Sequence, residues 1–293
     1  MKIDKFAGCL VVGFGLLGAM LTGAQAQTIK IGVVVPLTGP AAPWGTAAKV
    51  GIQILANDIN AKGGLEAGGK KYQIQVIAYD DQYKASEAIA AYTRLTTLDG
   101  VKELILQGSP QSNALKQMVE DDKVLTFTTA AAGNIIDAKS RYMFRATSVP
   151  AQFVPPFVRW MRDNMKERRV AIMNPNQDGA WDQTELALKY FKEYGFTVVD
   201  SELFEPGMKD FAPVLTKVIA ANPEIIELAA VAPASAGLLI RQARELGYKG
   251  KFTKNSGPAP QEILNAAGKD AAEGMLMLFY GNVSAPGYQH LAE

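Results

Sequence analysis

The sequence predicts an α/β protein with two doubly wound, Rossmann-like lobes and a hinged cleft between them. Three observations predict this fold. Short β-rich runs alternate with segments of helical periodicity, the alternation restarts once near the middle of the chain, and Pro150, Pro155 and Pro156 mark the restart. Strands that alternate with helices form parallel sheets, so each series predicts one sheet with helices on both faces.

The first 26 residues differ from the rest of the chain. Two lysines precede an apolar run at 9–21, and the small-x-small pattern Ala-Gln-Ala follows at 24–26. This order is typical of a secretory signal peptide cleaved after Ala26, and the run is too short to span a bilayer comfortably. A buried N-terminal helix or a membrane anchor is the alternative. Cys9, the only cysteine, lies inside this segment, so we expect an exported, periplasmic protein without disulfides.

The first series begins with a strand that ends at the turn Thr38-Gly39-Pro40. The next helix stops at Gly63-Gly64, and its predicted apolar face consists of Val50, Ile54, Leu55 and Ile59. The second helix has a face made of Ala88, Ala91, Tyr92 and Leu95. We expect strands at 29–37, 72–79, 101–106 and 124–128 and helices at 46–60, 86–98 and 112–122.

The second series repeats this architecture without strong identity to the first. We expect strands at 169–173, 197–203, 225–231, 251–254 and 275–280, and helices at 153–165, 181–194, 211–221, 235–246 and 259–267. The predicted organisation is a signal peptide at 1–26, an N-terminal lobe at 27–148, a C-terminal lobe at 149–276, and a hinge crossing at 277–293.

Composition disfavours several classes of function. With 30 basic and 29 acidic residues the charge is balanced, so a nucleic-acid partner is not expected. His290 is the only histidine and lies almost at the C-terminus, which disfavours a catalytic triad and a His/Cys metal site. We therefore expect no catalysis, no metal and no cofactor. Asp80-Asp81 can be read as an acid–base pair, but we favour a turn that caps the following helix.

Loops that follow strands remain as binding candidates, because ligands of open α/β sheets bind at the carboxyl ends of strands. Trp44 lies in a Gly/Pro loop after the first strand, where it can cover a ligand or pack between lobes. Ser109 follows the third strand beside a helix N-terminus, and its hydroxyl can bond a carboxylate. Further candidate loops lie at 128–133, 174–181, 232–235 and 255–258.

Several runs resemble the branched-chain amino acid binding proteins, which are type I periplasmic binding proteins. They are residues 29–44, DINAKGG at 58–64, YDDQ at 79–82, RQARELG at 241–247 and AAEGML at 271–276. The resemblance covers essentially all of the mature chain. It implies a monomeric solute-binding protein that delivers a small molecule to an inner-membrane ABC permease. Family chains continue well past Glu293, so the resemblance also implies that the C-terminal part of the fold is missing.

The resemblance implies a set of ligand contacts. Ser109 would hold a ligand carboxylate, Ala130 would add a backbone contact, and Ala132 stands where the family has a threonine. Trp44, and Trp181 or a close neighbour, would supply the aromatic lining.

Two departures concern the second lobe. Ser256 stands where the family's amino-acid binders hold the ammonium with a glutamate, and Ala232 or Pro233 replaces a tyrosine. A buried ammonium without an anionic partner is costly. We therefore expect an aromatic or aliphatic acid without an α-ammonium group, or an amide. The alternatives are an ordinary branched-chain amino acid binder and a soluble ligand sensor for a signalling partner.

Overall fold

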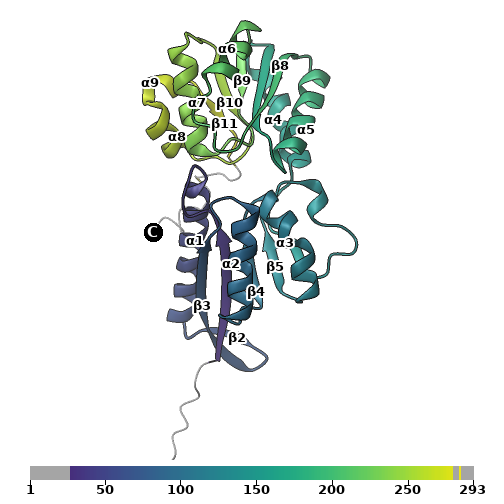
Figure 1. Cartoon of the computed structure of the whole chain (residues 1–293), viewed down its shortest axis with the longest axis vertical. Helices are drawn as coiled ribbons and strands as arrows, with labels where there is room; N and C mark the ends of the chain where they lie inside the picture. The colour runs from purple at the N-terminus through teal and green to yellow at the C-terminus, as the bar shows by residue number, and fades with distance from the viewer. Residues whose placement is uncertain (1–26, 280–283, 285–293) are drawn as a thin grey trace, which may run out of the picture.

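The computed structural model describes residues 27–279 and Ser284, and it contains two β-sheets in two stacked lobes (Figure 1). The first sheet has six strands in the order β2-β3-β1-β4-β5-β6. All its pairings are parallel except that of β2 with β3. Its strands are β1 (Gln27–Val35), β2 (Leu65–Ala67), β3 (Lys70–Asp80), β4 (Glu103–Leu106), β5 (Leu125–Thr128) and β6 (Met143–Arg145).

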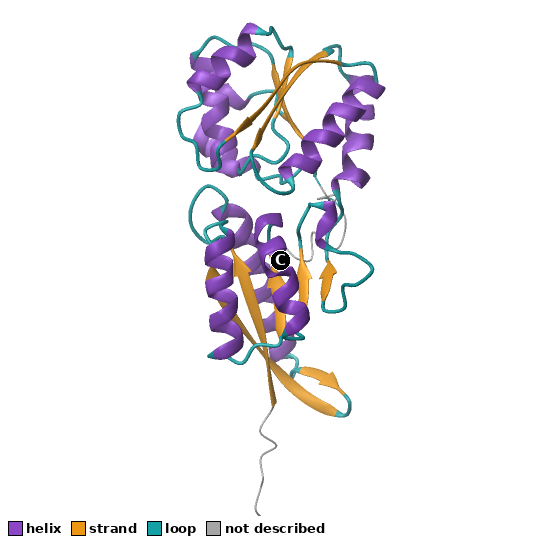
Figure 2. Ribbon diagram, turned by 45° about the vertical axis from the view of Figure 1, so that its right-hand side comes forward, coloured by secondary structure: helices purple, strands orange, loops and turns teal. Residues whose placement is uncertain are grey.

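The second sheet has five parallel strands in the order β11-β10-β9-β7-β8. Its strands are β7 (Arg169–Pro175), β8 (Thr197–Phe204), β9 (Ile225–Glu227), β10 (Lys251–Lys254) and β11 (Leu276–Met277). Figure 2 shows helices on both sides of this sheet. They are α4 (Pro150–Asn164), α5 (Ala180–Glu193), α6 (Ala212–Ala220), α7 (Pro233–Glu245), α8 (Pro260–Ala267) and α9 (Lys269–Ala272).

The second lobe has a core on each face of its sheet. Along β7, Val170 and Ile172 join a cluster with α4 and α5, whereas Ala171 and Met173 join a cluster with α6, α7 and α8. Because successive side chains of a strand point to opposite faces, this alternation buries β7 on both sides. The expectation of a doubly covered sheet is met in this lobe.

The first lobe is packed by α1 (Ala42–Ala61), α2 (Ala85–Thr97), α3 (Ser109–Asp121) and the short 3₁₀ helix η1 (Gly133–Ile135). The predicted face of α2 is confirmed, since its buried residues are Ala88, Ala91, Tyr92 and Leu95. The predicted face of α1 is wrong: Val50, Ile54 and Leu55 are each at least half exposed. Its buried residues are Gly45 and Ala56, because α1 contacts β1 and β3 through small residues.

Several local predictions differ from the structure. The strand predicted at 72–79 is β3, but β2, which pairs with it, and β6 were not predicted, because these two strands have only three residues each. β9 ends at Glu227 rather than at 231, and β11 spans two residues. The Asp80-Asp81 cap is wrong as well, since α2 begins after Lys84 without a side-chain cap. The signal peptide and most of the predicted hinge crossing lie outside the described residues.

Candidate functional site

A cavity of about 450 Å³ lies between the lobes, and we call it the first chamber. Its walls are the segments that follow β1, β3, β4, β5 and β6 in the first lobe and β7, β9 and β10 in the second. This placement is the one expected for open α/β sheets, whose ligands bind outside the carboxyl ends of the strands. The volume falls within the range of small-molecule sites, roughly 300–1,000 Å³.

Two helix N-termini meet at the first chamber. Gly108 precedes α3 in the first lobe and Gly179 precedes α5 in the second, both with positive φ. A Cβ placed on Gly179 would lie 2.5 Å from Ser109 Oγ, so the lobes approach this closely only because residue 179 has no side chain. Helix N-termini present free N–H groups and partial positive charge, which favours an anion between them.

Ser109 is the first residue of α3, and it lines the first chamber. Its Oγ accepts hydrogen bonds from the N–H groups of Ala131 and Ala132, both at 3.0 Å. A hydroxyl that accepts two hydrogen bonds still has its own proton to donate. Ser109 can therefore donate to a ligand carboxylate while its oxygen holds the loop after β5 in place.

Ala130 and Ala132 do not line the first chamber, whereas Thr129 and Ala131 do. The carbonyls of both alanines accept hydrogen bonds from the Arg145 guanidinium, that of Ala132 at 2.8 Å. Burial lowers the pKa of Arg145, and the charge of Asp182 opposes that shift. Arg145 thus holds the backbone on either side of Ala131, and Ala131 itself lines the cavity.

Three aromatic side chains, Trp44, Tyr83 and Phe153, line the first chamber. Trp44 and Tyr83 make an edge contact with ring centroids 6.0 Å apart. Trp44 also reaches the second lobe: its Nε1 donates to the Gly257 carbonyl at 3.4 Å. A Cβ on Gly257 would lie 2.8 Å from the Trp44 ring, so this glycine permits the contact.

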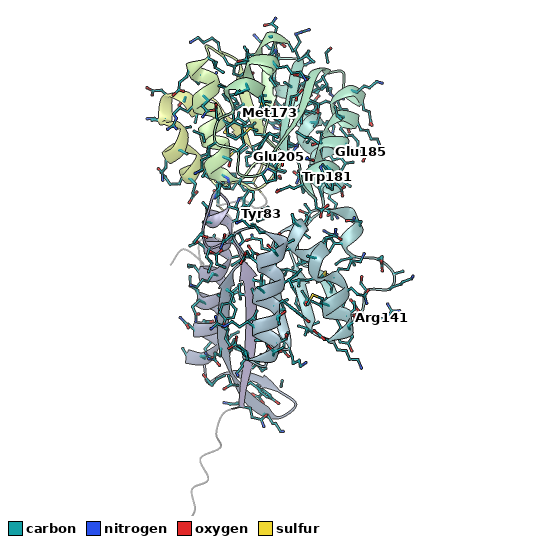
Figure 3. All side chains as sticks on the ribbon, viewed as in Figure 1. Tyr83, Arg141, Met173, Trp181, Glu185 and Glu205 are labelled. Carbon is teal, nitrogen blue, oxygen red and sulfur yellow. The ribbon has the colours of Figure 1, made fainter. Side chains whose placement is uncertain are left out.

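Trp181 is the predicted aromatic that lies away from this group. It is 48% exposed, is not part of the chamber lining, and donates through Nε1 to Asn176 Oδ1 at 2.9 Å. Figure 3 shows Trp181 at the lower margin of the upper lobe, to one side of Tyr83.

Ser256 lines the wall that the second lobe contributes. Its Oγ lies 2.7 Å from both Gln183 Oε1 and the Ala229 carbonyl, and its single proton can serve one of them at a time. Gln183 also lines the chamber. This part of the wall is therefore polar and uncharged.

Two carboxylates nevertheless line the first chamber, Asp178 and Glu262. Asp178 Oδ2 accepts a hydrogen bond from Asn113 Nδ2 across the lobes at 3.2 Å. No lysine, arginine or histidine occurs among the described residues that line this cavity. Sequence reasoning considered the Ser256 position alone and missed both carboxylates, although Asp178 lies in the predicted loop at 174–181.

Tyr83 was also missed, and the aspartates before it explain its position. Asp80 Oδ1 accepts from the N–H of Leu37 at 2.7 Å, and its two oxygens bind the N–H and hydroxyl of Thr38. Asp81 Oδ1 accepts from the N–H of Tyr83 at 2.8 Å. Gln82 and Tyr83 both have left-handed backbone conformations, which turn the chain towards the cavity.

The two aspartates differ in proton affinity. Burial would raise the pKa of Asp80, but hydrogen bonds from Thr38, Gln82 and Leu37 outweigh that effect and lower it. Burial raises the pKa of Asp81 to about 7, and the Asp80 charge adds to the shift. Asp81 is fully buried, and its Oδ2 has no hydrogen-bond partner among the described residues.

A second pair of buried charges lies behind the wall of the second lobe. Lys254 Nζ donates to the carbonyls of Leu228, Ala229 and Val231 at 2.7–3.2 Å. Glu227 accepts from the Thr253 hydroxyl and from the N–H of Asn255. Burial lowers the pKa of Lys254 and raises that of Glu227. These bonds fix the loops that carry Ala230 and Ser256 into the cavity.

Two further findings concern the part of the chain that the structure describes. It contains no group of three or more His, Cys, Asp or Glu side chains arranged to hold a metal ion. None of its helices has both the length and the apolar composition needed to cross a bilayer.

Comparisons with known proteins agree with this geometry. The Leu/Ile/Val-binding protein of Escherichia coli K12 is 27% identical over 273 residues, covering 92% of this chain and 71% of the relative. The fatty acid ABC transporter substrate-binding protein from Thermomonospora curvata superposes with a TM-score of 0.79 at 25% identity, over 91% of this chain and 68% of that one.

A structure of LivJ from Streptococcus pneumoniae with isoleucine gives a TM-score of 0.77 at 24% identity, over 90% of this chain and 75% of that one. The family model described as periplasmic binding protein matches residues 28–293. The chain therefore belongs to the periplasmic binding protein family, with the two-lobed α/β fold of its branched-chain amino acid-binding members.

Proposed function

We propose that this protein captures a small carboxylate by closure of its two lobes and delivers it to an ABC permease in the inner membrane. One observation carries the proposal: the N-termini of α3 and α5 converge at Ser109 and Gly179 beside the first chamber, a cavity of about 450 Å³ between the lobes. A carboxylate between them would receive a hydrogen bond from the Ser109 hydroxyl and would be stabilised by the partial positive charge of both helix N-termini. The ligand would thus bind both lobes through the same group.

The body of the ligand would lie against Trp44, Tyr83 and Phe153, which form the apolar part of the lining. Aromatic faces bury a large apolar area at low entropic cost. The wall at Ser256 and Gln183 is uncharged. An aliphatic or aromatic acid without an α-ammonium group fits these two features, and it is our leading candidate.

An ordinary branched-chain amino acid is the second candidate, and Asp178 and Glu262 favour it. Both carboxylates line the first chamber, and either can neutralise an ammonium group there. The E. coli relative is a Leu/Ile/Val-binding protein, which points the same way. In this case the ammonium site would have moved from the Ser256 position to another residue of the same wall.

We further propose that the chain is exported to the periplasm by the signal peptide at 1–26 and acts there as a monomer. Solute-binding proteins of this family pass ligand to a membrane permease, which requires that location. Cell fractionation with an intact and a deleted 1–26 segment tests the export step.

Calorimetric titration with matched ligand pairs tests the ligand class. Leucine is compared with 4-methylpentanoate, and phenylalanine with 3-phenylpropionate, since each pair differs by the amino group alone. Tighter binding of the deaminated acid supports the leading candidate. Tighter binding of the amino acid, weakened by Glu262→Gln or Asp178→Asn, supports the second. The proposal as a whole fails if no carboxylate binds, or if Ser109→Ala leaves the affinity of every bound acid unchanged.

A further inference from the structure

A second cavity, of about 500 Å³, also lies between the lobes, and we call it the second chamber. Its walls are the loops after β1 and β3 in the first lobe and those after β7, β8 and β9 in the second. Tyr83 and Gln177 line both chambers, one from each lobe, so the two cavities adjoin at these side chains. Figure 3 shows Tyr83 at the top of the lower lobe, facing the upper one.

The two chambers have opposite charge. The second chamber is lined by Lys84 of the first lobe and Lys209 of the second, and by no aspartate or glutamate. The first chamber is lined by two carboxylates and no basic residue. Among the described residues, neither lysine forms an ion pair, and Lys84 Nζ bonds the Gln82 amide at 3.1 Å. Closure therefore places two ammonium groups around one cavity.

The wall that α7 contributes to the second chamber can donate hydrogen bonds to an anion. Ser235 lies in the first turn of α7 and is 8% exposed, and its hydroxyl has no hydrogen-bond partner among the described residues. The Ser235 hydroxyl is therefore free to donate a hydrogen bond to a ligand in this chamber. The α7 N-terminus adds partial positive charge at the same place. The rest of the wall includes the apolar side chains of Phe204, Pro175 and Val231.

We propose that the second chamber binds a carboxylate at the far end of an elongated ligand whose first carboxylate lies at Ser109. The ligand class is then a linear dicarboxylate, with its chain passing between Tyr83 and Gln177. Ser235 and the α7 N-terminus bind the second carboxylate, and Lys84 and Lys209 neutralise it from either lobe. This inference rests on the proposed function, because it requires the first carboxylate to occupy the first chamber.

Titration calorimetry with acids of equal length tests the inference, pairing hexanoate with adipate and octanoate with suberate. We expect the diacid to bind about tenfold more tightly than its monoacid at low salt. The advantage should shrink as salt rises, because Lys84 and Lys209 are exposed and their charges are screened. Equal affinities of mono- and diacids at low salt would overturn the inference.

Substitutions separate this inference from the proposed function. Ser235→Ala combined with Lys209→Ala should remove the advantage of the diacid and leave monoacid affinity unchanged. Lys249→Ala with Ser201→Ala, exposed positions of the same lobe outside both chambers, should leave the advantage intact. If Ser109→Ala weakens monoacid binding but diacids bind no more tightly than monoacids, only the proposed role of the second chamber is refuted. If neither class of acid binds, the proposed function fails and this inference with it.

Discussion

The two lobes share one architecture but bury their sheets differently. The second sheet carries an apolar cluster on each face. Among the described residues, the first sheet has one such cluster, against α2 and α3. On β5 the buried residues are Thr126 and Thr128, whereas Leu125 and Phe127 are exposed. The centroid of the Phe127 ring lies 5.9 Å from that of Phe144 on β6. Similar strand–helix patterns can therefore lead to different coverage, because coverage depends on which elements pack against each face.

The largest effect that separates the lobes should come from truncation of a core side chain. Leu239→Ala removes a fully buried side chain of the second lobe and should lower the free energy of unfolding by about 2–5 kcal/mol. Ile54→Ala on α1 should change it by no more than about 0.5 kcal/mol, because that residue is half exposed. Urea unfolding followed by circular dichroism measures both. Comparable losses would mean that the α1 face is buried in solution.

The next largest effect on the free energy of unfolding should come from a buried carboxylate in the first lobe. Asp81 has a folded-state pKa of about 7, above its unfolded value, so its contribution to stability is complete below about pH 4 and is lost as pH rises through 7. Asp81→Asn should remove this loss and raise stability at pH 8 by about 2–4 kcal/mol.

Asp80→Asn is the matched control for that measurement, since the pKa of Asp80 is lowered and its stabilisation is present at neutral pH. This variant should be less stable than wild type at pH 8, with a difference that narrows as the solution is acidified. Thermal melts of both variants between pH 4 and pH 8 measure these changes. Relative to wild type at pH 8, the melting temperature should rise in Asp81→Asn and fall in Asp80→Asn. The same sign in both would contradict the assigned environments.

The contact between the lobes can be broken at Gly179. Gly179→Ala should weaken ligand binding by about tenfold or more, because the new Cβ would lie 2.5 Å from Ser109 Oγ. Gly195→Ala has a nearly identical positive φ but nothing within 4 Å of its Cβ, so it controls for backbone strain. Isothermal titration of the two variants isolates the contact. Equal weakening would assign the effect to strain alone.

The smallest effect on stability is expected on the exposed face of the first sheet. Phe127→Thr should change the free energy of unfolding by about 0.5 kcal/mol or less and should reduce binding of the dye ANS. Ile172→Thr in the second sheet is the control, and its buried hydroxyl should cost about 1–3 kcal/mol. Unchanged dye binding by Phe127→Thr would show that this face is covered in solution.

Much of the fold could be predicted from the sequence, because the positions of helices and strands depend on local residue patterns. The α2 face and the position of β10 at Lys251–Lys254 follow from periodicity and turn residues. The exposure of Val50 and Ile54 could not be predicted, because periodicity shows that a helix has an apolar face but not what packs on it. The strands at 65–67 and 143–145 are too short to carry a pattern of their own.

For the candidate site, the sequence indicated which loops form it better than which residues line it. Trp44, Ser109 and Ser256 line the first chamber, and Ala130 and Ala132 lie one position from residues that do. Tyr83 depends on two left-handed residues, and Glu262 reaches the cavity from the first turn of a helix. Such positions are set by tertiary geometry, which one sequence does not display.

Among the described residues, three hydrogen bonds that involve a side chain cross between the lobes: Trp44 to Gly257, Asn113 to Asp178, and the Gly133 N–H to Asp182 at 2.6 Å. A ligand held by both lobes is released more readily when these contacts open, so we expect its residence time to depend on how often the lobes separate. Weakening any of the three should speed dissociation far more than it changes the rate of capture. We therefore expect the contacts between the lobes, as well as direct contacts with the ligand, to set how long a ligand stays bound, and a partner that separates the lobes would speed its release.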